Sequence, residues 1–188
     1  DRIVNQIIDY ARPREIAAFS FDMAQLVHEV TKVLDEPLAG KQVTIQVSAP
    51  DAPYTIQADR DQLKQVLLNV MQNAIEASPS GASIAVTLAQ LARGGEPGLE
   101  IAVADRGAGI SPAHLPHVFE PFFTSGKPRG TGLGLAICRN ILDAHGGDIA
   151  LDSESEHGTI VRVWAPLRQQ PLRIQEEEQH AGHDLRHR

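Results

Sequence analysis

Two asparagines four residues apart could ligate a hard cation. Asn69 and Asn73 lie in a stretch with helical periodicity, so their side chains share one helix face, offset from the apolar one, with Glu76 beside them. Mg²⁺ prefers a few oxygen ligands together with phosphate and water, and amide oxygens suit it. Taken alone, the pair is explained better as a solvated polar face, so the metal interpretation needs support from other segments.

A second polar group follows an apolar run that ends at Ala104. Asp105 is followed by Gly107, Gly109 and Ile110. A carboxylate at the end of a strand can accept a hydrogen bond from an exocyclic amine such as that of adenine, and glycines let the backbone approach a flat ring. An ordinary Asp-x-Gly turn explains this segment equally well when it is considered alone.

Aromatic and basic residues are concentrated in the stretch 119–129. It holds three of the five phenylalanines, and Phe122 precedes a run that includes Thr124, Ser125, Lys127 and Arg129. The stretch is interpreted either as a loop that its aromatics hold against the core, or as a mobile lid whose Lys127 or Arg129 reaches phosphates.

A glycine run then opens an expected helix; it comprises Gly130, Thr131, Gly132, Leu133, Gly134 and Leu135. Backbone N–H groups and the positive end of the helix dipole suit phosphate. No Gly-Lys-Ser/Thr follows, which excludes a P-loop, and the glycine spacing does not match a dinucleotide fingerprint.

The elements that must position these groups follow from periodicity and from turn residues. We expect an extended piece at 17–21, helices at 22–38, 60–78 and 132–145, strands at 43–47, 54–58, 82–91, 98–104, 148–153 and 159–165, and a loop at 105–131. This order predicts an α+β fold, a two-layer α/β sandwich with a mixed, mainly antiparallel sheet of about five strands and three helices on one face.

The two ends of the chain differ from this central part. Residues 1–13 are interpreted as the end of a longer helix, residues 17–166 as one domain, and residues 167–188 as a disordered tail. The tail spacing of His180, His183 and His187 could bind a transition metal, but a disordered tail explains it better.

The composition limits the kinds of partner that this chain is expected to bind. The net charge of −7 and the lack of a basic stripe argue against nucleic-acid binding. The single Cys138 excludes an internal disulfide and fits a reducing, cytoplasmic compartment. No apolar run approaches the roughly 20 residues that span a bilayer, so we expect no direct membrane contact by this chain. The start at Asp1 suggests a fragment, whose parent protein can still be anchored in the inner membrane.

The four segments, in this order, resemble the N, G1, F and G2 boxes of the catalytic domain of bacterial sensor histidine kinases, over roughly residues 17–166. That domain shares its ATP-binding (Bergerat) fold with gyrase, MutL and heat-shock chaperone ATPases. The run Gly-Thr-Gly-Leu-Gly-Leu-Ala at 130–136 is typical of the kinases, and Gly158-Thr159 resembles the remaining glycine box. Residues 2–13 are similar to the end of the dimerisation helix in kinases of the nitrogen-sensing and zinc-responsive type.

The resemblance implies transfer of the γ-phosphoryl group of ATP, with Mg²⁺, to a histidine on the protein's own dimerisation domain. A homodimer would then relay the phosphoryl group to a response-regulator aspartate. Asn73 would coordinate Mg²⁺ with Asn69 beside it, and Asp105 would bind the adenine amine. The expected catalytic residues are Asn69, Asn73, Lys127 and Arg129. The expected nucleotide contacts are Asn69, Asn73, Glu76, Asp105, Gly107, Gly109, Ile110, Phe122, Thr124, Ser125, Lys127, Arg129, Gly130, Thr131, Gly132, Leu133, Gly134, Leu135 and Thr159.

Two details qualify the resemblance. Related kinases often have Thr-Thr-Lys after the phenylalanines, whereas Lys127 is displaced here by one position, which leaves its phosphate contact open. Hydrolysing relatives place a glutamate where Asn69 stands, and an amide cannot take a proton from water. This asparagine therefore favours phosphoryl transfer over hydrolysis.

The acceptor histidine is expected to lie outside this chain. None of the eight histidines falls in the stub, and His28-Glu29 lacks the proline that should follow, because Val33 stands there. Two alternatives remain open: a serine kinase of the anti-sigma-factor type with the same fold, and a nucleotide-binding module without catalysis.

Overall fold

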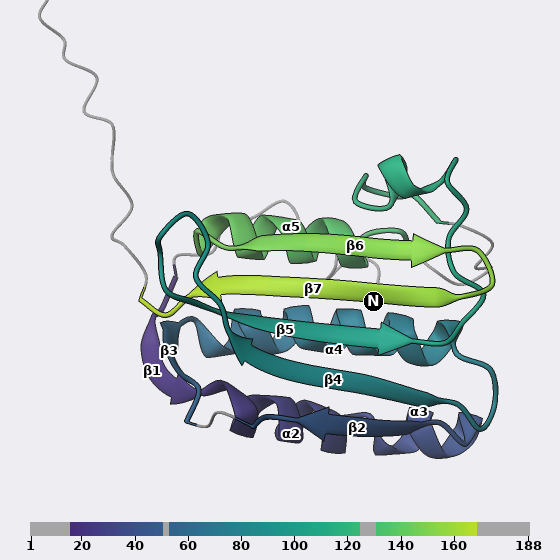
Figure 1. The fold of residues 1–188 in the computed structure, drawn as a ribbon, viewed down its shortest axis with the longest axis horizontal. Coiled ribbons are helices and arrows are strands. Elements are labelled where there is room, and N and C mark those ends of the chain that lie inside the picture. The colour runs from purple at the N-terminus through teal and green to yellow at the C-terminus, as the bar shows by residue number, and fades with distance from the viewer. Residues whose placement is uncertain (1–15, 51–52, 125–130, 169–188) are drawn as a thin grey trace, which may run out of the picture.

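A five-stranded sheet with helices against one face organises the molecule, which the computed structural model describes for residues 16–50, 53–124 and 131–168 (Figure 1). The elements are β1 (Phe19–Asp22), α2 (Met23–Val33), α3 (Asp35–Lys41), β2 (Thr44–Ser48), β3 (Thr55–Ala58), α4 (Arg60–Ala77), β4 (Ser83–Gln90), β5 (Gly98–Asp105), the 3₁₀ turn η1 (Leu115–His117), α5 (Gly134–Ala144), β6 (Asp148–Glu154) and β7 (Gly158–Pro166).

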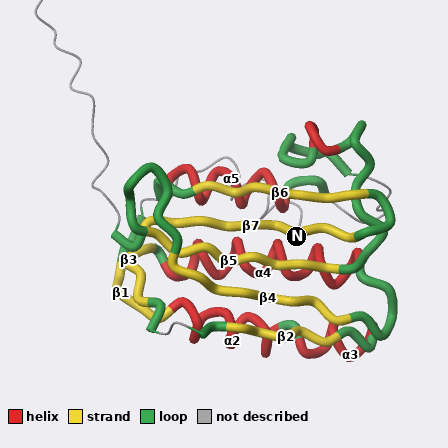
Figure 2. Tube along the Cα trace, viewed as in Figure 1, coloured by secondary structure: helices red, strands yellow, loops and turns green. Residues whose placement is uncertain are grey.

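The strand order in the main sheet is β2-β4-β5-β7-β6, and a separate pair is formed by β1 and β3. Only β2 and β4 run parallel, and the other neighbours are antiparallel. The helices lie together behind this sheet in Figure 1, and Figure 2 shows the same two layers by element type. The expected two-layer sandwich with a mixed, mainly antiparallel sheet of five strands is therefore confirmed.

The core lies between the two layers. Along β4, buried Ile84, Val86 and Leu88 alternate with exposed residues, as expected for a strand with one covered face. Apolar side chains of α2 and α4 meet them, including Leu26, Val30, Leu63 and Val66. Each such side chain contributes about 1.5–3 kcal/mol when it is buried. None of the described helices is long and apolar enough to cross a lipid bilayer.

The helix count was predicted wrongly, because the single helix expected at 22–38 is two helices, giving four α-helices rather than three in the described residues. The break falls at Leu34, whose φ of −93° and ψ of 5° are not helical. In a continuous helix the ring of Pro37 would clash with the carbonyl of Val33. After the break, Pro37 lies in the first turn of α3, where its missing N–H is not needed. The helical spacing predicts that Val33 belongs to the apolar face, but this residue, directly before the break, is 57% exposed.

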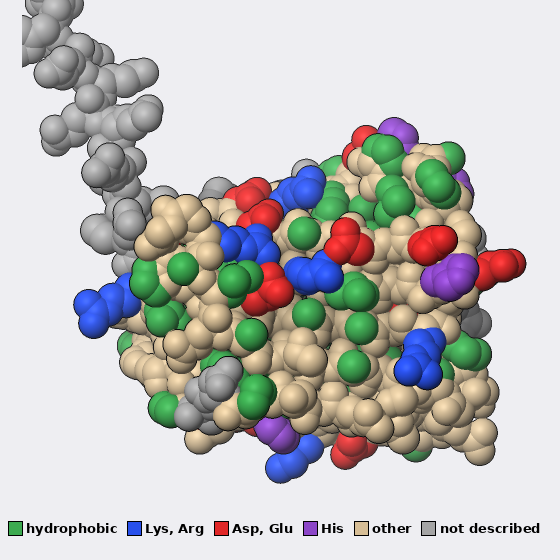
Figure 3. All heavy atoms as spheres, in the orientation of Figure 1, with side chains coloured by type: hydrophobic (Ala, Val, Ile, Leu, Met, Phe, Trp, Pro, Cys, Tyr) green, Lys and Arg blue, Asp and Glu red, His purple; other side chains and the backbone are tan. Residues whose placement is uncertain are grey.

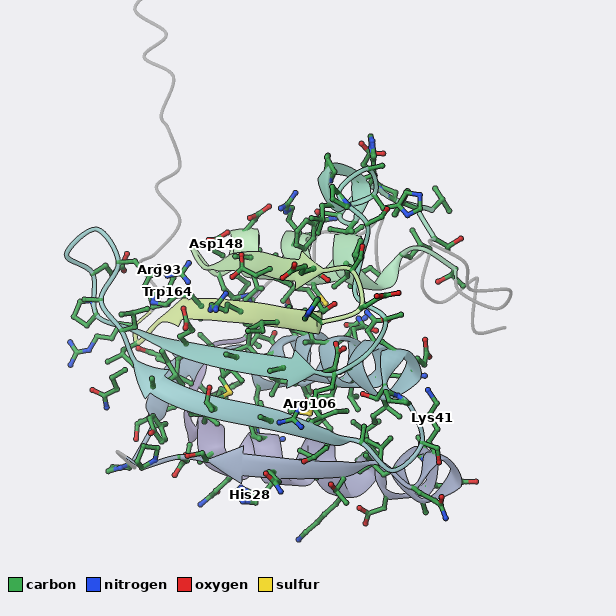
Figure 4. The ribbon with its side chains drawn as sticks, turned by 45° about the vertical axis from the view of Figure 1, so that its right-hand side comes forward. His28, Lys41, Arg93, Arg106, Asp148 and Trp164 are labelled. Carbon is green, nitrogen blue, oxygen red and sulfur yellow. The ribbon has the colours of Figure 1, made fainter. Side chains whose placement is uncertain are left out.

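Opposite charges and an aromatic ring hold together the open face of the sheet. Arg93 donates to Asp148 at 2.9 Å and to Glu100 at 2.8 Å, and its guanidinium lies 5.6 Å from the ring centroid of Trp164. Figure 4 shows Arg93, Trp164 and Asp148 together at one end of β6 and β7, and Figure 3 shows charged side chains gathered over these strands. The pair with Glu100 is partly buried and the Asp148 carboxylate is exposed. Surface ion pairs contribute only about 0–1 kcal/mol each, so the packed face dominates stability.

A buried polar link joins the start of α4 to the end of α5. The carboxylate of Asp59 caps α4 by accepting from the amides of Asp61 and Gln62, both at 3.1 Å. The Asp59 amide donates to Nε2 of His145 at 3.1 Å, and Nδ1 of His145 lies 2.7 Å from the Ile141 carbonyl oxygen. Because Nδ1 must donate and Nε2 must accept, the ring is neutral. Burial lowers the pKa of His145 against the opposing effects of the Ile141 carbonyl and Asp59.

This link predicts acid sensitivity of the fold. Because the pKa of His145 is lower in the folded state, both states hold it neutral above its ordinary value of about 6.5, and the unfolded state binds more protons below that value. The free energy of unfolding should therefore fall as the pH drops below about 6.5. Urea unfolding at pH 7.5 and 5.5 would measure the loss. We expect the His145→Gln variant to lose less stability over this interval than the original chain. An equal loss in both would contradict the assignment, and His157→Gln, which changes an exposed histidine, is the control.

Candidate functional site

The expected site segments gather at one end of the sheet. The ends of β5, α4 and β6 and the start of β7 lie at the right-hand edge in Figure 1, and α5 begins behind β6. Helix α4 is the common neighbour. An added Cβ on Gly107 would lie 2.6 Å from the Ala77 carbonyl oxygen, and one on Gly134 would lie 3.7 Å from Oδ1 of Asn69. The Asp105 loop and the start of α5 are thus brought against α4 at positions roughly 12 Å apart along its axis.

The polar face of α4 lies between these two contacts. Asn69 and Asn73 are half-buried and Glu76 is exposed, while Val70 and Ala74 are buried. The predicted offset between the polar and apolar faces is therefore present. The helical spacing of the apolar residues predicts that Ala77 belongs to the apolar face, but it is exposed, and Met71 and Ile75 extend that face instead. Ala77 is the last residue of the helix, and Gly107 approaches its carbonyl.

A lysine from α3 fixes the last turn of α4. The ammonium group of Lys41 donates to the carbonyl oxygens of Ile75 at 3.0 Å, Glu76 at 2.6 Å and Ser78 at 2.7 Å. Figure 4 shows Lys41 beside this end of the helix. Carbonyls at a helix C-terminus lack intrahelical partners, and the negative end of the dipole favours a cation there. The turn that carries Glu76 and supports Gly107 is therefore held by three bonds.

Asn69 faces the first turns of α5. An added Cβ on Gly134 would touch it, and it hydrogen-bonds the thiol of Cys138. Full burial raises the pKa of that thiol to about 12, and the bond from Asn69 opposes this shift only in part. The thiol is therefore protonated near neutral pH and inert. It also lies 3.8 Å from the Val66 carbonyl oxygen, so it belongs to the packing between α4 and α5.

Three polar residues form a row across the end of the sheet. Asp105 on β5 pairs with Thr159 on β7, which pairs with Ser153 on β6. Directly paired residues point to the same face, and this is the face that the helices cover. Asp105 and Thr159 are each only 8% exposed. The Asp105 carboxylate accepts from the Gly107 amide at 2.7 Å, which begins the expected turn.

The loop after β5 is held against the hairpin of β6 and β7. The Ile110 amide donates to the Ser153 hydroxyl at 2.8 Å, and the Glu156 amide donates to the Ala108 carbonyl at 2.7 Å. Gly109 has a φ of +67°, and an added Cβ there would collide with the carbonyl oxygen of Glu154. Glycine is therefore required at this position by both conformation and space.

The phenylalanine segment is anchored at several points. The Phe122 amide donates to the Gly132 carbonyl at 2.9 Å, which joins the two ends of the segment between them. Phe122 is 66% exposed and has a φ of +66°, and an added Cβ on Gly132 would collide with it. Arg139 lies over the Phe119 ring at 3.9 Å from its centroid. Expected contacts Ser125, Lys127, Arg129 and Gly130 lie outside the described residues, and Thr124 is exposed.

Helix α5 begins at Gly134, within the glycine run and two residues later than expected. Thr131, Gly132 and Leu135 are half-buried, and Leu133 is buried and fixes the start of the helix in the core. The residue that precedes the helix, Leu133, has no side-chain group that could cap the first amides of α5. The start of this helix has the properties that suit an anion.

Sequence reasoning missed two residues, Ser153 and Lys41. Ser153 lies between Asp152 and Glu154 at the polar end of a strand, which gives no local signal, and its partners come from the loop after β5 and from the start of β7. Lys41 has the signal of a basic residue at a helix end, but its carbonyl partners are 34 to 37 residues away. Both contacts depend on tertiary structure.

Known proteins that resemble this chain belong to one family. Residues 58–169 match the family described as histidine kinase-, DNA gyrase B-, and HSP90-like ATPase. The chain is 34% identical over 167 residues to the sensor histidine kinase ZraS of Escherichia coli K12, covering 89% of this chain and 35% of ZraS. This chain therefore spans about a third of the length of that relative.

Solved structures show the same fold. The catalytic domain of the histidine kinase ThkA matches with a TM-score of 0.72 and 31% identity, covering 81% of this chain and 97% of that domain. A structure of ThkA with the response regulator TrrA matches with a TM-score of 0.73 and 29% identity, over 88% of this chain and 46% of that one. Full-length ShkA in complex with AMPPNP matches with a TM-score of 0.76 and 26% identity, over 90% of this chain and 36% of ShkA. The chain belongs to the histidine kinase-, DNA gyrase B- and HSP90-like ATPase family, and its fold is that of a histidine kinase catalytic domain.

Proposed function

We propose that this chain binds Mg-ATP and transfers its γ-phosphoryl group to a histidine on a dimerisation domain of the same protein, for relay to a response regulator. The observation that carries the proposal is the arrangement around α4. Gly107 of the loop that follows Asp105 and Gly134 at the start of α5 contact the helix on either side of Asn73. If the base lies near Gly107 and the phosphates lie near Gly134, the phosphate chain runs along the face of α4 that carries Asn69 and Asn73.

The roles of the residues follow from their chemistry. The Asp105 carboxylate, at the buried end of β5, accepts a hydrogen bond from the exocyclic amine of adenine. The amides of Gly132 and Gly134 and the dipole of α5 hold phosphate oxygens. Lys127 and Arg129, which lie outside the described residues, would add positive charge toward the phosphates.

The α4 face fits Mg²⁺. Asn73 offers a neutral amide oxygen from a half-buried position, with Asn69 one turn before it and Glu76 beside it. The ion supplies neutralisation of the phosphate charge when it is bound. Asn69 faces Gly134 and the protonated thiol of Cys138, so these neighbours provide no base to activate water. This surrounding favours transfer over hydrolysis.

The partners are inferred from the relatives. ThkA was solved with a response regulator, and ZraS is a sensor histidine kinase about three times as long as the part matched here. We infer that residues 1–13 end a dimerisation helix, that residues 17–166 form the catalytic domain, and that the full-length protein is a homodimer. The function is tested by incubating this chain with γ-labelled ATP, Mg²⁺ and a purified dimerisation domain encoded next to it. Acid-labile, base-stable label on that domain is expected, whereas acid-stable label on a serine would favour the serine kinase alternative.

The Asp105→Asn variant should bind ADP more weakly while it stays folded. Asparagine keeps an oxygen for the Gly107 amide, so the turn survives, but the charge-assisted bond to the adenine amine is lost. The expected cost is about 1.5–3 kcal/mol, or roughly tenfold or more in affinity. Titration calorimetry with ADP measures it, and the exposed Asp143→Asn on α5 is the matched control. Unchanged ADP affinity would remove Asp105 from the base site.

The Asn73→Ala variant should abolish Mg²⁺-dependent transfer while part of the metal-free nucleotide binding survives. The loss of a metal ligand removes charge neutralisation during transfer, an effect of several kcal/mol. The transfer rate is measured against Mg²⁺ concentration, together with the melting temperature. Asn140→Ala makes the same chemical change at an exposed position of α5 and should leave transfer unchanged. A lower melting temperature with near-normal transfer would show that Asn73 is structural.

A further inference from the structure

We infer that Ser153 is a positioning residue that makes the site selective for purines with a 6-amino group over those with a 6-oxo group. It acts by fixing the direction of the Thr159 hydroxyl proton. The inference rests on the proposed nucleotide-binding function and deepens it, because it assigns a determinant of base specificity to a residue that does not touch the base.

The Ser153 hydroxyl has three neighbours. Its oxygen lies 2.8 Å from the donating Ile110 amide, 2.9 Å from the Gly158 carbonyl oxygen and 2.8 Å from the Thr159 hydroxyl oxygen. These contacts connect the loop after β5, the turn before β7 and β7 itself. Ser153 is half-buried, so the contacts are partly shielded from water.

Counting protons leaves one arrangement that satisfies all three contacts. A carbonyl oxygen only accepts and an amide only donates, whereas a serine hydroxyl has one proton and two lone pairs. The Ser153 proton must therefore go to Gly158, and one lone pair receives the Ile110 amide. The Thr159 hydroxyl must then donate its proton to the second lone pair of Ser153.

This arrangement determines what Thr159 can offer a base. With its proton directed to Ser153, the Thr159 oxygen acts toward other groups as an acceptor. Thr159 pairs directly with Asp105 across β5 and β7, so the two side chains share a face, and an ionised carboxylate also only accepts. Two acceptors side by side suit a ligand that donates. The 6-amino group of adenine donates, whereas a 6-oxo group accepts and would leave both unmatched.

The Ser153→Ala variant frees the Thr159 proton, which can then donate to a 6-oxo group. Calorimetry with ADP and IDP, whose bases differ at this position, gives the two dissociation constants on the full 188-residue chain. We expect the preference for ADP over IDP to fall by about tenfold, which corresponds to about one hydrogen bond. Because the preference is a ratio measured on one sample, a fraction of unfolded protein changes both affinities equally and leaves it unaltered.

Three further variants separate this role from a structural one. Ser153→Thr keeps the hydroxyl on a β-branched side chain that suits a strand, so it should restore the ADP preference. In a Thr159→Val background, Ser153→Ala should no longer change the preference, because the hydroxyl it orients is gone. Ser155→Ala alters an exposed serine of the same hairpin and is the control. In Ser153→Ala without nucleotide, hydrogen exchange of the Ile110 amide should be faster, since its acceptor is lost.

The outcomes are distinct. An ADP preference that is unchanged in Ser153→Ala, or that changes equally with and without the Thr159 hydroxyl, would overturn the inference and leave the proposed function intact. Equal weakening of ADP and IDP would show that Ser153 only supports the fold. If the unmodified chain binds neither nucleotide, or binds both equally, the proposed assignment of the base site fails as well.

Discussion

The clamping of α4 at both ends is the constraint on which the site depends. At its start the Asp59 carboxylate caps the first amides, and at its end the Lys41 ammonium group holds three carbonyl oxygens. Between these points the apolar face packs on the sheet, which fixes the rotation of the helix about its axis. A residue advances by about 100° around a helix, so a small rotation would move Asn73 away from the face between Gly107 and Gly134. The site geometry is therefore a consequence of core packing and capping.

The sheet forms the other side of the site, where the residues on its covered face change from apolar to polar. Val103, Val161 and Leu151 form an apolar row across β5, β7 and β6, and two positions nearer the site the row is Asp105, Thr159 and Ser153. Polar groups at the end of a core need partners, because an unpaired buried donor or acceptor costs about 1–3 kcal/mol. Ser153 meets this requirement for the Ile110 amide and the Gly158 carbonyl. The Thr159 oxygen can then still accept a hydrogen bond from a ligand.

Local patterns predicted most of the elements, because each strand and helix has its own periodicity. They failed where a distant contact or a single backbone clash decides the structure. The apolar residues from Leu26 to Leu38 continue at helical spacing, and this signal hid the clash that Pro37 imposes on Val33. Applying the rule for proline to the residue four positions earlier would have found the break.

The candidate site was predictable only in part, for a related reason. Groups that would face a nucleotide, such as Asp105 and Asn73, occur in short motifs, so spacing reveals them. Ser153 and Lys41 support these groups, and their partners are set by strand register and by the packing of α3 on α4. A strand serine before an exposed turn has no local signal of such a role. The correct pairing of β6 with β7 is needed before its three partners can be identified.

The surroundings of Asn69 explain how such a site can hold ATP without consuming it. Asn69 packs against Gly134 and the Cys138 thiol, whose pKa burial raises to about 12. A glutamate at this position could take a proton from an attacking water, but it would also place a charge against an apolar interior, which is costly. The amide avoids that cost and leaves proton transfer to the attacking group. In the proposed reaction that group is a histidine nitrogen with its own lone pair, so the domain has only to hold the phosphoryl group and neutralise its charge.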